Sequence, residues 1–319
     1  MKDYRIVLAL LALLTTRSFG TATMPTPVEP APLRLYADVY SLSFTMVHEF
    51  PFVSTNINGT AGKLLFDTGN QDALSLNDHL LTNLGEGAVV GSGFVGSGQT
   101  YTVTRRTKID HVVIGTGKQA LQFTDVPNIL SQDTRFLEGI TPDCLGWLGY
   151  DFFQGYLMKL DYARKVLTFY KTTDARRRTK DFLRGEKVIA VLPFETRKLP
   201  NHPLLHVKVG DQDILAAFDT GQMGTVTMSK TMQETLASRK LLTMLTEKRC
   251  RIDGILLTGD RGESITASVE NVPLFDKPGP AAGPMGTPEA NILSLGYAFL
   301  KQYKTVWDYP DKKIYLLKR

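Results

Sequence analysis

The chain has few cysteines. Only Cys144 and Cys250 occur in 319 residues, which is too few for a disulfide scaffold in a protein of this size. One bridge between them and a pair of buried thiols are both compatible with the sequence. The composition is 43% hydrophobic and 22% charged, which is typical of a globular chain that folds around its own hydrophobic core.

Neither the histidines nor the charges cluster in a way that indicates a metal or a nucleic acid. Of the five histidines, His202 and His206 lie four residues apart, but they flank a strand-like segment beside Pro203 rather than a helix face. We therefore expect no metal site and no cofactor. The formal charge of +5 is spread along the chain, and a mild excess of this kind does not indicate nucleic-acid binding. The densest basic run, ARRRTK at 175–180, is interpreted as a solvated linker.

Long hydrophobic runs are missing beyond the N-terminus. There, Lys2 and Arg5 precede the nine-residue apolar stretch IVLALLALL at 6–14, and small residues follow it. This order is that of a secretory signal peptide, placed at 1–22, and the apolar stretch is too short to span a bilayer comfortably. We expect an exported protein, periplasmic or extracellular, with no membrane contact after cleavage. An uncleaved anchor is the alternative.

The rest of the chain contains an internal repeat. Pro51 lies 16 residues before Asp67, and Pro203 lies 16 residues before Asp219. Each interval reads as a strand, a polar turn and a second strand. Two further pairs of segments match: KIDHVVIGTG (108–117) with RIDGILLTGD (251–260), and LGYDFFQGYLMKLDYARKVLTFYK (148–171) with LGYAFLKQYKTVWDYPDKKIYLLK (295–318). A repeat of about half the chain length indicates two similar lobes.

The lobes differ in the segment after each DTG triplet. The first lobe has nine more residues there, and its glycine-rich stretch at 85–98 is flanked by β-forming residues, which predicts a mobile β-hairpin within 87–104. The second lobe carries SKTMQETLASRKLLTML (229–245) instead, which reads as a helix. The stretch at 276–289 is rich in proline and glycine and reads as a long surface loop.

Most remaining segments are short runs of β-forming residues separated by Gly, Asp and Asn. We therefore predict an all-β, bilobal fold with few short helices. The expected units are a proline-rich linker at 23–32, an N-terminal lobe with the hairpin at 33–174, an inter-lobe linker at 175–186 and a C-terminal lobe at 187–319.

The two DTG triplets indicate chemistry. An apolar strand runs into Asp67 in one lobe and into Asp219 in the other. A pseudo-twofold axis would bring the two carboxylates face to face, where they cannot both ionise at low cost and therefore share a proton. One carboxyl group is then an acid and the other a base, and a water between them can attack a carbonyl carbon. A single DTG is compatible with a purely structural turn, but equivalent turns in two lobes favour catalysis.

With these motifs the sequence resembles the pepsin and retropepsin family of aspartic proteases, specifically the bacterial two-lobe aspartyl proteases, over about 33–319. The family places two hydrophobic residues and a glycine beneath each DTG. Trp147-Leu148-Gly149 matches this element, and Ser294-Leu295-Gly296 matches it with Ser in one hydrophobic place. The resemblance implies a pepsin-like fold and an aspartic endopeptidase in which Asp67 and Asp219 are catalytic. It also implies that the first-lobe hairpin is a flap that closes over a peptide.

The resemblance also assigns residues around the two aspartates. The active-site turns would comprise Thr68, Gly69, Asn70, Thr220, Gly221 and Gln222. Family members usually follow DTG with Ser, Thr or Ala, so Asn70 and Gln222 depart from the pattern. We expect the Asn70 amide to replace the hydroxyl that would hold the outer carboxylate oxygen, and the longer Gln222 to be the poorer substitute. Phe94 and Tyr101 are the flap residues expected to face the substrate.

The expected partner is a peptide or protein substrate, and the protein is expected to be a monomer. The alternative function is a pepsin-like fold that binds peptides, glycans or another protein with little or no cleavage, because Asn70 and Gln222 depart from the family pattern. A third interpretation, an anchored envelope protein with a structural role, depends on an uncleaved signal alone.

Overall fold

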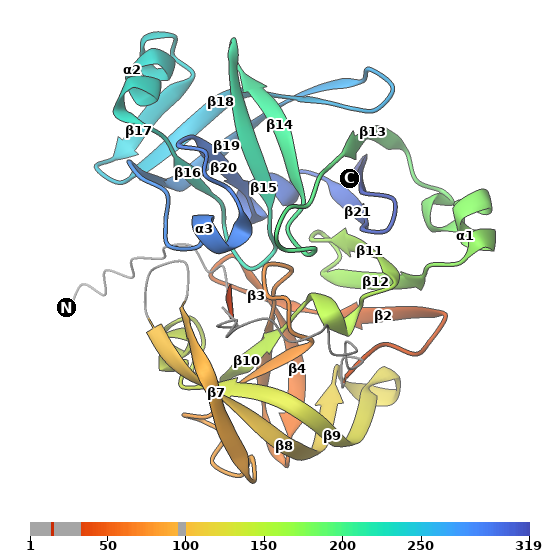
Figure 1. Ribbon diagram of the computed structural model, residues 1–319. Coiled ribbons are helices and arrows are strands. Elements are labelled where there is room, and N and C mark those ends of the chain that lie inside the picture. Colours follow the sequence, from red (N-terminus) through yellow and green to blue (C-terminus); the bar gives the residue numbers. More distant parts are fainter. Residues whose placement is uncertain (1–13, 16–32, 95–99) are drawn as a thin grey trace, which may run out of the picture.

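The computed structural model describes residues 14–15, 33–94 and 100–319 (Figure 1). Its strands form three sheets of nine, six and seven strands. The predicted signal peptide at 1–22, apart from Leu14–Thr15, and the linker at 23–32 lie outside the described residues. In the described part of the chain, no helix is long and apolar enough to cross a membrane.

The nine-stranded sheet belongs to the first half of the chain. Its strands, in spatial order, are β1 (Leu14–Thr15), β7 (Gly87–Phe94), β8 (Thr100–Ile114), β9 (Leu121–Gln132), β6 (Leu74–Asn77), β10 (Cys144–Leu148), β5 (Thr60–Phe66), β4 (Phe50–Ile57) and β3 (Thr45–Val47). The predicted hairpin before Asp67 is β4–β5. Asn58 and Gly59 at its tip have φ of 48° and 88°, which suits the right-handed twist of the flanking strands.

The seven-stranded sheet belongs to the second half. Its strands, in spatial order, are β14 (Leu204–Val209), β15 (Gln212–Phe218), β20 (Ile292–Leu295), β16 (Thr225–Thr227), β19 (Ser264–Phe275), β18 (Arg249–Thr258) and β17 (Leu242–Thr246). The predicted hairpin before Asp219 is β14–β15, in which Leu204 pairs with Ala217. In Figure 1 the two large sheets lie in the lower and upper halves of the molecule.

The six-stranded sheet joins the two halves. Its strands, in spatial order, are β13 (Val188–Pro193), β22 (Lys313–Leu317), β21 (Lys304–Asp308), β11 (Tyr156–Asp161), β12 (Val166–Lys171) and β2 (Val39–Ser43). The repeated segments after each LGY meet at its centre, where Lys159 of β11 pairs with Val306 of β21. These two residues are also equivalent in the repeat, which offsets the segments by 147 positions. The pseudo-twofold axis therefore passes through this pair.

The helices are short. They are α1 (Asp174–Thr179), α2 (Lys230–Ser238), α3 (Ala282–Met285) and α4 (Tyr297–Leu300), with 3-10 turns η1 (Gly117–Gln119), η2 (Arg135–Gly139), η3 (Tyr150–Phe152) and η4 (Asp181–Leu183). The helix predicted over 229–245 is only partly correct, because α2 ends at Ser238. Lys240 then takes a φ of 59°, and the apolar residues that follow form β17, which pairs with β18.

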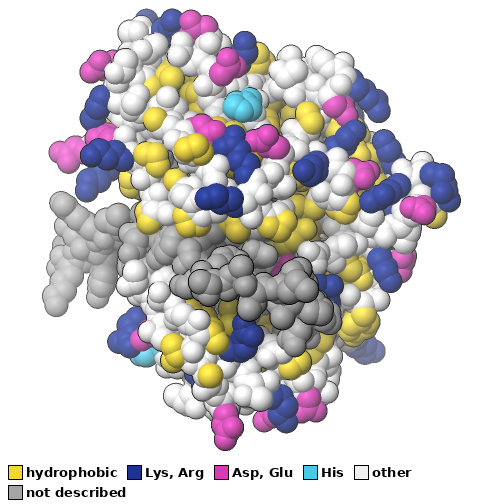
Figure 2. Space-filling view, in the orientation of Figure 1, with side chains coloured by type: hydrophobic (Ala, Val, Ile, Leu, Met, Phe, Trp, Pro, Cys, Tyr) yellow, Lys and Arg dark blue, Asp and Glu magenta, His cyan; other side chains and the backbone are white. Residues whose placement is uncertain are grey.

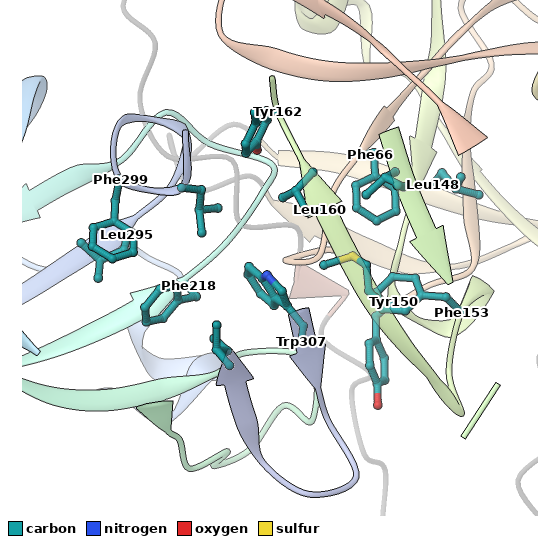
Figure 3. Packing of buried hydrophobic residues seen from close by; sticks show 14 of the residues in the cluster. Phe66, Leu148, Tyr150, Phe153, Leu160, Tyr162, Phe218, Leu295, Phe299 and Trp307 are labelled. Atoms are coloured by element: carbon teal, nitrogen blue, oxygen red, sulfur yellow. The ribbon is translucent and has the colours of Figure 1, made fainter. Parts of the chain in front are cut away.

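The hydrophobic core also follows the repeat. Phe66 and Phe218 end the strands that lead to the two aspartates, and both are fully buried. Figure 3 shows Phe218, Leu295 and Phe299 on one side and Phe66, Leu148 and Phe153 on the other, with Trp307 and Leu160 between them. Cys144 and Cys250 are both buried and free among the described residues, which decides between the two states that the sequence left open.

Candidate functional site

Each DTG turn begins where a buried strand ends. β5 pairs in parallel with β10 up to Phe66 and Leu148, and the N–H of Asp67 then donates to the carbonyl oxygen of Leu148 at 3.0 Å. β15 pairs in the same way with β20, and the N–H of Asp219 points to the carbonyl oxygen of Leu295 at 3.5 Å. The two hydrophobic residues and glycine predicted beneath each DTG thus lie at the ends of β10 and β20. Each of these strands pairs with the strand that leads to the aspartate and fixes where that strand ends.

The glycine that follows β10 or β20 leaves room for the adjacent DTG turn. A β-carbon at Gly149 would lie 2.4 Å from the carbonyl oxygen of Asn70, and one at Gly296 would lie 2.1 Å from that of Gln222. Both distances are far inside van der Waals contact. Glycine is therefore the residue that lets the two backbones pass so closely.

The two turns hold each other through their threonines. The N–H of Thr68 donates to Oγ1 of Thr220 at 3.0 Å, and the N–H of Thr220 donates to Oγ1 of Thr68 at 3.0 Å. Both threonines are fully buried. These reciprocal bonds join residues 152 positions apart in sequence and lock the two lobes in register at the aspartates.

This register brings the two carboxylates together, as the sequence predicted. Oδ1 of Asp67 accepts from the N–H of Gly69 at 2.7 Å and from that of Asn70 at 3.2 Å. Oδ1 of Asp219 accepts from the N–H of Gly221 at 2.8 Å and also from the N–H of Gly69 at 3.1 Å. The single Gly69 N–H is therefore shared by both aspartates.

The protonation of the pair follows from its burial. Asp67 is fully buried and Asp219 is 1% exposed. Burial raises the pKa of Asp67 well above its usual range, the nearby Asp219 carboxylate raises it further, and the N–H groups of Gly69 and Asn70 oppose the shift. Two carboxylates in this arrangement favour one shared proton over two charges. The pair can thus supply an acid and a base at the same place.

Asn70 and Gln222, the residues after the two DTG triplets, behave opposite to the prediction that Asn70 would hold its carboxylate better than Gln222. The side-chain amide of Asn70 donates to Oγ of Ser75 at 3.4 Å rather than to the carboxylate of Asp67 or Asp219, and only the backbone N–H of Asn70 reaches Asp67. Gln222, expected to be the poorer substitute, donates from Nε2 to Oδ2 of Asp219 at 3.1 Å. The longer side chain can turn back to the carboxylate, whereas the short Asn70 side chain accepts from the N–H of Asp72.

Of the two residues predicted to lie on the flap, the structure describes the side chain of Tyr101 but not that of Phe94. The predicted hairpin is β7–β8, in which the backbones of Phe94 and Thr100 pair, while its tip at 95–99 and the Phe94 side chain lie outside the described residues. Phe94 therefore stays a prediction. Tyr101 is buried, and burial followed by the charges of Asp72 and Asp67 raises its pKa. Its ring packs in a cluster with Phe50, Leu65 and Trp147.

Two residues that the sequence analysis did not assign to the site hold the first turn from the second lobe. Nδ2 of Asn201 donates to the carbonyl oxygens of Thr68 (3.0 Å) and Gly69 (2.9 Å). Nε2 of His202 lies 3.1 Å from the same Gly69 oxygen and must carry the proton, because a carbonyl oxygen only accepts. Burial lowers the pKa of His202. Their position just before Pro203, the repeat partner of Pro51, was the available signal.

The stretch at 276–289 lies mostly at the surface, as predicted, but part of it is packed against the second lobe. It contains α3, and Ala281 and Thr287 within it are 2% and 1% exposed. Residues of this stretch, among them Ala281 and Thr287, line a cavity together with Asp219 and Gln222. Figure 2 shows hydrophobic side chains on this face where the upper and lower halves meet.

Within 33–94 and 100–319, no group of three or more His, Cys, Asp or Glu side chains is arranged to hold a metal ion. The chemistry that the site offers from its own residues is proton transfer between two carboxyl groups and a molecule bound beside them.

Comparisons with known proteins identify the fold. No protein-family model matches the chain, and no curated protein sequence matches it. Basic 7S globulin from soybean is similar in structure, with a TM-score of 0.51 and 9% identity over 88% of this chain and 95% of that one. Conglutin gamma, a basic 7S globulin from lupine seeds, has a TM-score of 0.53 and 10% identity over the same shares. The all-β, bilobal, pepsin-like fold is confirmed, while the assignment to a protease family stays a prediction.

Proposed function

We propose that the protein is an exported aspartic endopeptidase that hydrolyses peptide bonds with Asp67 and Asp219. The observation that carries this proposal is the Gly69 N–H, which hydrogen-bonds both carboxylates at once. A structural turn needs one aspartate to accept its own N–H groups. It does not need a second buried carboxylate from the other lobe. Burying that carboxylate costs free energy, and a catalytic role is a reason for the fold to bear this cost.

The reaction follows from the shared proton. In the proposed cycle the shared proton of the pair starts on Asp67, and Asp219 starts as the base. Asp219 takes a proton from water while the water oxygen bonds to the peptide carbonyl carbon, and Asp67 gives its proton to the carbonyl oxygen. The resulting diol then collapses. The C–N bond breaks, the amide nitrogen takes the proton from Asp219, and a diol hydroxyl returns a proton to Asp67.

The surrounding residues position this chemistry without taking part in it. Reciprocal threonine bonds fix the distance between the turns, and Gln222 Nε2 orients Oδ2 of Asp219. Tyr101 of the β7–β8 hairpin packs with Leu65 and Trp147, the residues beneath Asp67. A hairpin in this place suits a cover that excludes water from the bound peptide.

Hydrolysis of a mixed peptide library tests the proposal. The purified protein is incubated with the library from pH 3 to pH 8, with and without a peptide whose scissile bond is replaced by a hydroxyethylene group. We expect cleavage that this hydroxyl-bearing isostere inhibits, because its hydroxyl takes the place of the attacking water. A folded sample that cleaves nothing at any pH would refute the proposal.

A binding module for peptides, glycans or another protein is the second candidate. The observation in its favour is Asn70, whose amide turns away from the first carboxylate. In addition, both similar solved structures are named as globulins rather than as hydrolases. This candidate predicts that the isostere peptide binds while no library peptide is cleaved. The mass of the bound and released peptides distinguishes the two candidates.

A further inference from the structure

Asn201 and His202 donate to the first DTG turn at the peptide groups that hold the carboxylates. The N–H of Gly69, from which both carboxylates accept, shares its peptide group with the carbonyl of Thr68. Nδ2 of Asn201 donates to that carbonyl oxygen at 3.0 Å. A peptide group that accepts a hydrogen bond at its oxygen is more strongly polarised, so its N–H is a stronger donor. Asn201 therefore acts on the hydrogen bond that the two aspartates share.

The next peptide group of the turn is held in the same way. The N–H of Asn70 donates to Oδ1 of Asp67 at 3.2 Å, and its peptide group carries the carbonyl of Gly69. That oxygen accepts from Nδ2 of Asn201 at 2.9 Å and from Nε2 of His202 at 3.1 Å. Both N–H groups that lower the pKa of Asp67 thus belong to peptide groups that are polarised from the second lobe.

The internal repeat shows that these positions support one turn only. The two DTG triplets lie 152 positions apart, so Asn201 corresponds to Glu49 of the first lobe. His202 corresponds to Phe50. An ionised carboxylate only accepts hydrogen bonds and a phenyl ring has no polar atom, so neither first-lobe side chain can donate to a carbonyl of the second turn. Phe50 packs instead in the apolar cluster with Trp147.

Both second-lobe side chains are buried with one polar atom unpaired. Asn201 is fully buried and His202 is 1% exposed. Among the described residues, Oδ1 of Asn201 and Nδ1 of His202 have no hydrogen-bond partner. An unpaired buried polar atom costs free energy, which the apolar Phe50 avoids. The hydrogen bonds to the first turn are a reason for polar residues to stand at these two positions.

We propose that Asn201 and His202 are positioning residues of the reaction, which stabilise the single negative charge of the aspartate pair through the peptide groups of the first turn. The inference rests on the proposed function, because it assigns a role within the same site. The pair can take a proton from water only when it carries this charge, and the loss of its first proton is a property of both carboxylates together. Weaker N–H donors make the charged pair less stable and raise the pKa of this step.

The other titratable groups that interact with the charges of the pair are few. Burial raises the pKa of Tyr101, Tyr162 and Tyr309, so all three stay neutral in acid. Burial lowers the pKa of His202, which favours a neutral imidazole that donates from Nε2. Asp72, whose Oδ2 accepts from Ser75, is common to every variant compared.

The pH dependence of kcat/KM tests the proposal, because its acidic limb reports the first proton of the free pair. His202→Phe installs the first-lobe residue, and Asn201→Ala removes the other donor. In each variant we expect the midpoint of the acidic limb to rise by about 0.3 to 0.6 pH unit, since lost polarisation changes a charge-assisted hydrogen bond by about 10–30%. His202→Gln keeps an Nε2 donor but cannot take up a proton, and it should restore the wild-type midpoint.

Leu236→Ala is the control for a loss of stability alone. Leu236 is a fully buried residue of α2 in the same lobe, outside both DTG turns. Its substitution should lower the midpoint of denaturant unfolding and leave the acidic limb unchanged. An acidic limb that stays in place in both His202→Phe and Asn201→Ala would overturn the proposal. A shift that persists in His202→Gln would also overturn it, because the charge of a protonated imidazole would then be responsible.

The outcomes separate this inference from the proposed function. Cleavage with an unshifted acidic limb would overturn the positioning role and leave the endopeptidase in place. If no peptide is cleaved, the pH dependence of the dissociation constant of the hydroxyethylene-isostere peptide replaces kcat/KM. A hydroxyl that donates to one carboxylate and accepts from the other carboxyl group needs the singly charged pair. A shift of that profile would support the positioning role while the endopeptidase is overturned, and failure of the isostere peptide to bind would overturn both.

Discussion

Beneath Asp67 the first lobe packs Leu65 against Trp147, whereas beneath Asp219 the second lobe pairs Ala217 with Ser294. The hydrogen bonds that hold the two aspartates differ much less between the lobes. In each turn the aspartate accepts from the N–H of the glycine of its own DTG, and the threonine hydroxyl of each turn accepts from a backbone N–H of the other turn. The contrast indicates that the backbone geometry for proton transfer is kept in both lobes, while the side chains around it are free to diverge. Divergence at these positions is what distinguishes one face of the site from the other.

The largest expected effect comes from the glycines that let the turns approach. A β-carbon at Gly221 would lie 2.1 Å from Cγ of Asp67, and one at Gly69 would lie 2.6 Å from Oδ2 of Asp219. Gly221→Ala and Gly69→Ala should each lower kcat by at least about 10²-fold, because a displacement of about 1 Å at the reacting groups is enough for such a loss. Gly139→Ala is the control, since an added β-carbon there meets no described atom within 4 Å. Normal kcat in Gly221→Ala would show that the carboxylates need not be this close.

The threonine pair tests whether the lobes are equivalent in stability. Thr68→Ala and Thr220→Ala each leave a buried N–H of the opposite turn without its acceptor, which costs about 1–3 kcal/mol of unfolding free energy. Thr220 also donates to the carbonyl oxygen of Phe66 at 3.1 Å, so its loss should be the greater of the two. Thr→Ser at either position keeps the hydroxyl and should recover most of the stability. Denaturant unfolding measures the differences in unfolding free energy. An unchanged midpoint in both alanine variants would contradict a stabilising role for the reciprocal Thr68–Thr220 hydrogen bonds.

The two lobes differ in how they hold each other's DTG turn, because Asn201 of the second lobe bonds the turn of the first lobe. Asn201→Ala removes two hydrogen bonds to the first turn and should cost about 1–3 kcal/mol. The matched control is Glu49→Ala, the equivalent position in the first lobe, where a substitution on a partly exposed turn should stay within about 0.5 kcal/mol. Similar losses of unfolding free energy in Asn201→Ala and Glu49→Ala would mean that the contact made by Asn201 is not specific to the second lobe.

The smallest effect, taken over one pH unit, is the pH dependence of stability. The folded-state pKa of Asp67 is raised by burial and then by Asp219, so the folded protein keeps a proton that the unfolded chain has lost. The stability that this group contributes is full below the unfolded pKa and falls as pH rises toward the folded value, by up to about 1.4 kcal/mol per pH unit. Asp67→Asn removes this slope. The unfolding free energy of the variant minus that of the wild type should therefore increase from pH 4 upward, and a flat difference would contradict the raised pKa.

The sequence predicted the parts of the molecule that the repeat determines. Both hairpins before the DTG triplets, the strands beneath them and the meeting of Asp67 with Asp219 follow from equal spacing in two halves of the chain. The structure also contains helix α2, but the sequence placed its end too late, because the apolar residues from Leu242 onward fit a helix and a strand equally well until β18 is present to pair with them.

Contacts between distant segments were beyond the sequence. Asn201 holds Thr68 across 133 positions. The repeat places Asn201 beside Pro203, but it does not say which turn the Asn201 side chain contacts. The stretch at 276–289 has the composition of a solvent-exposed loop, yet several of its small residues line the cavity beside the second aspartate. Asn70 and Gln222 were ranked by side-chain length, but the direction of each side chain depends on Ser75 and Asp219, whose positions come from the folded sheets.

Hydrolysis by the two single-aspartate variants tests the central claim most directly, namely that one carboxylate from each lobe acts on the same water. A peptide cleaved by the wild type is given to Asp67→Asn and to Asp219→Asn, and kcat is measured after circular dichroism has shown that both variants are folded. The account predicts a loss of about 10²–10⁴-fold in each variant, of similar size, because removing either partner removes the shared acid and base. Full activity in either variant would contradict it.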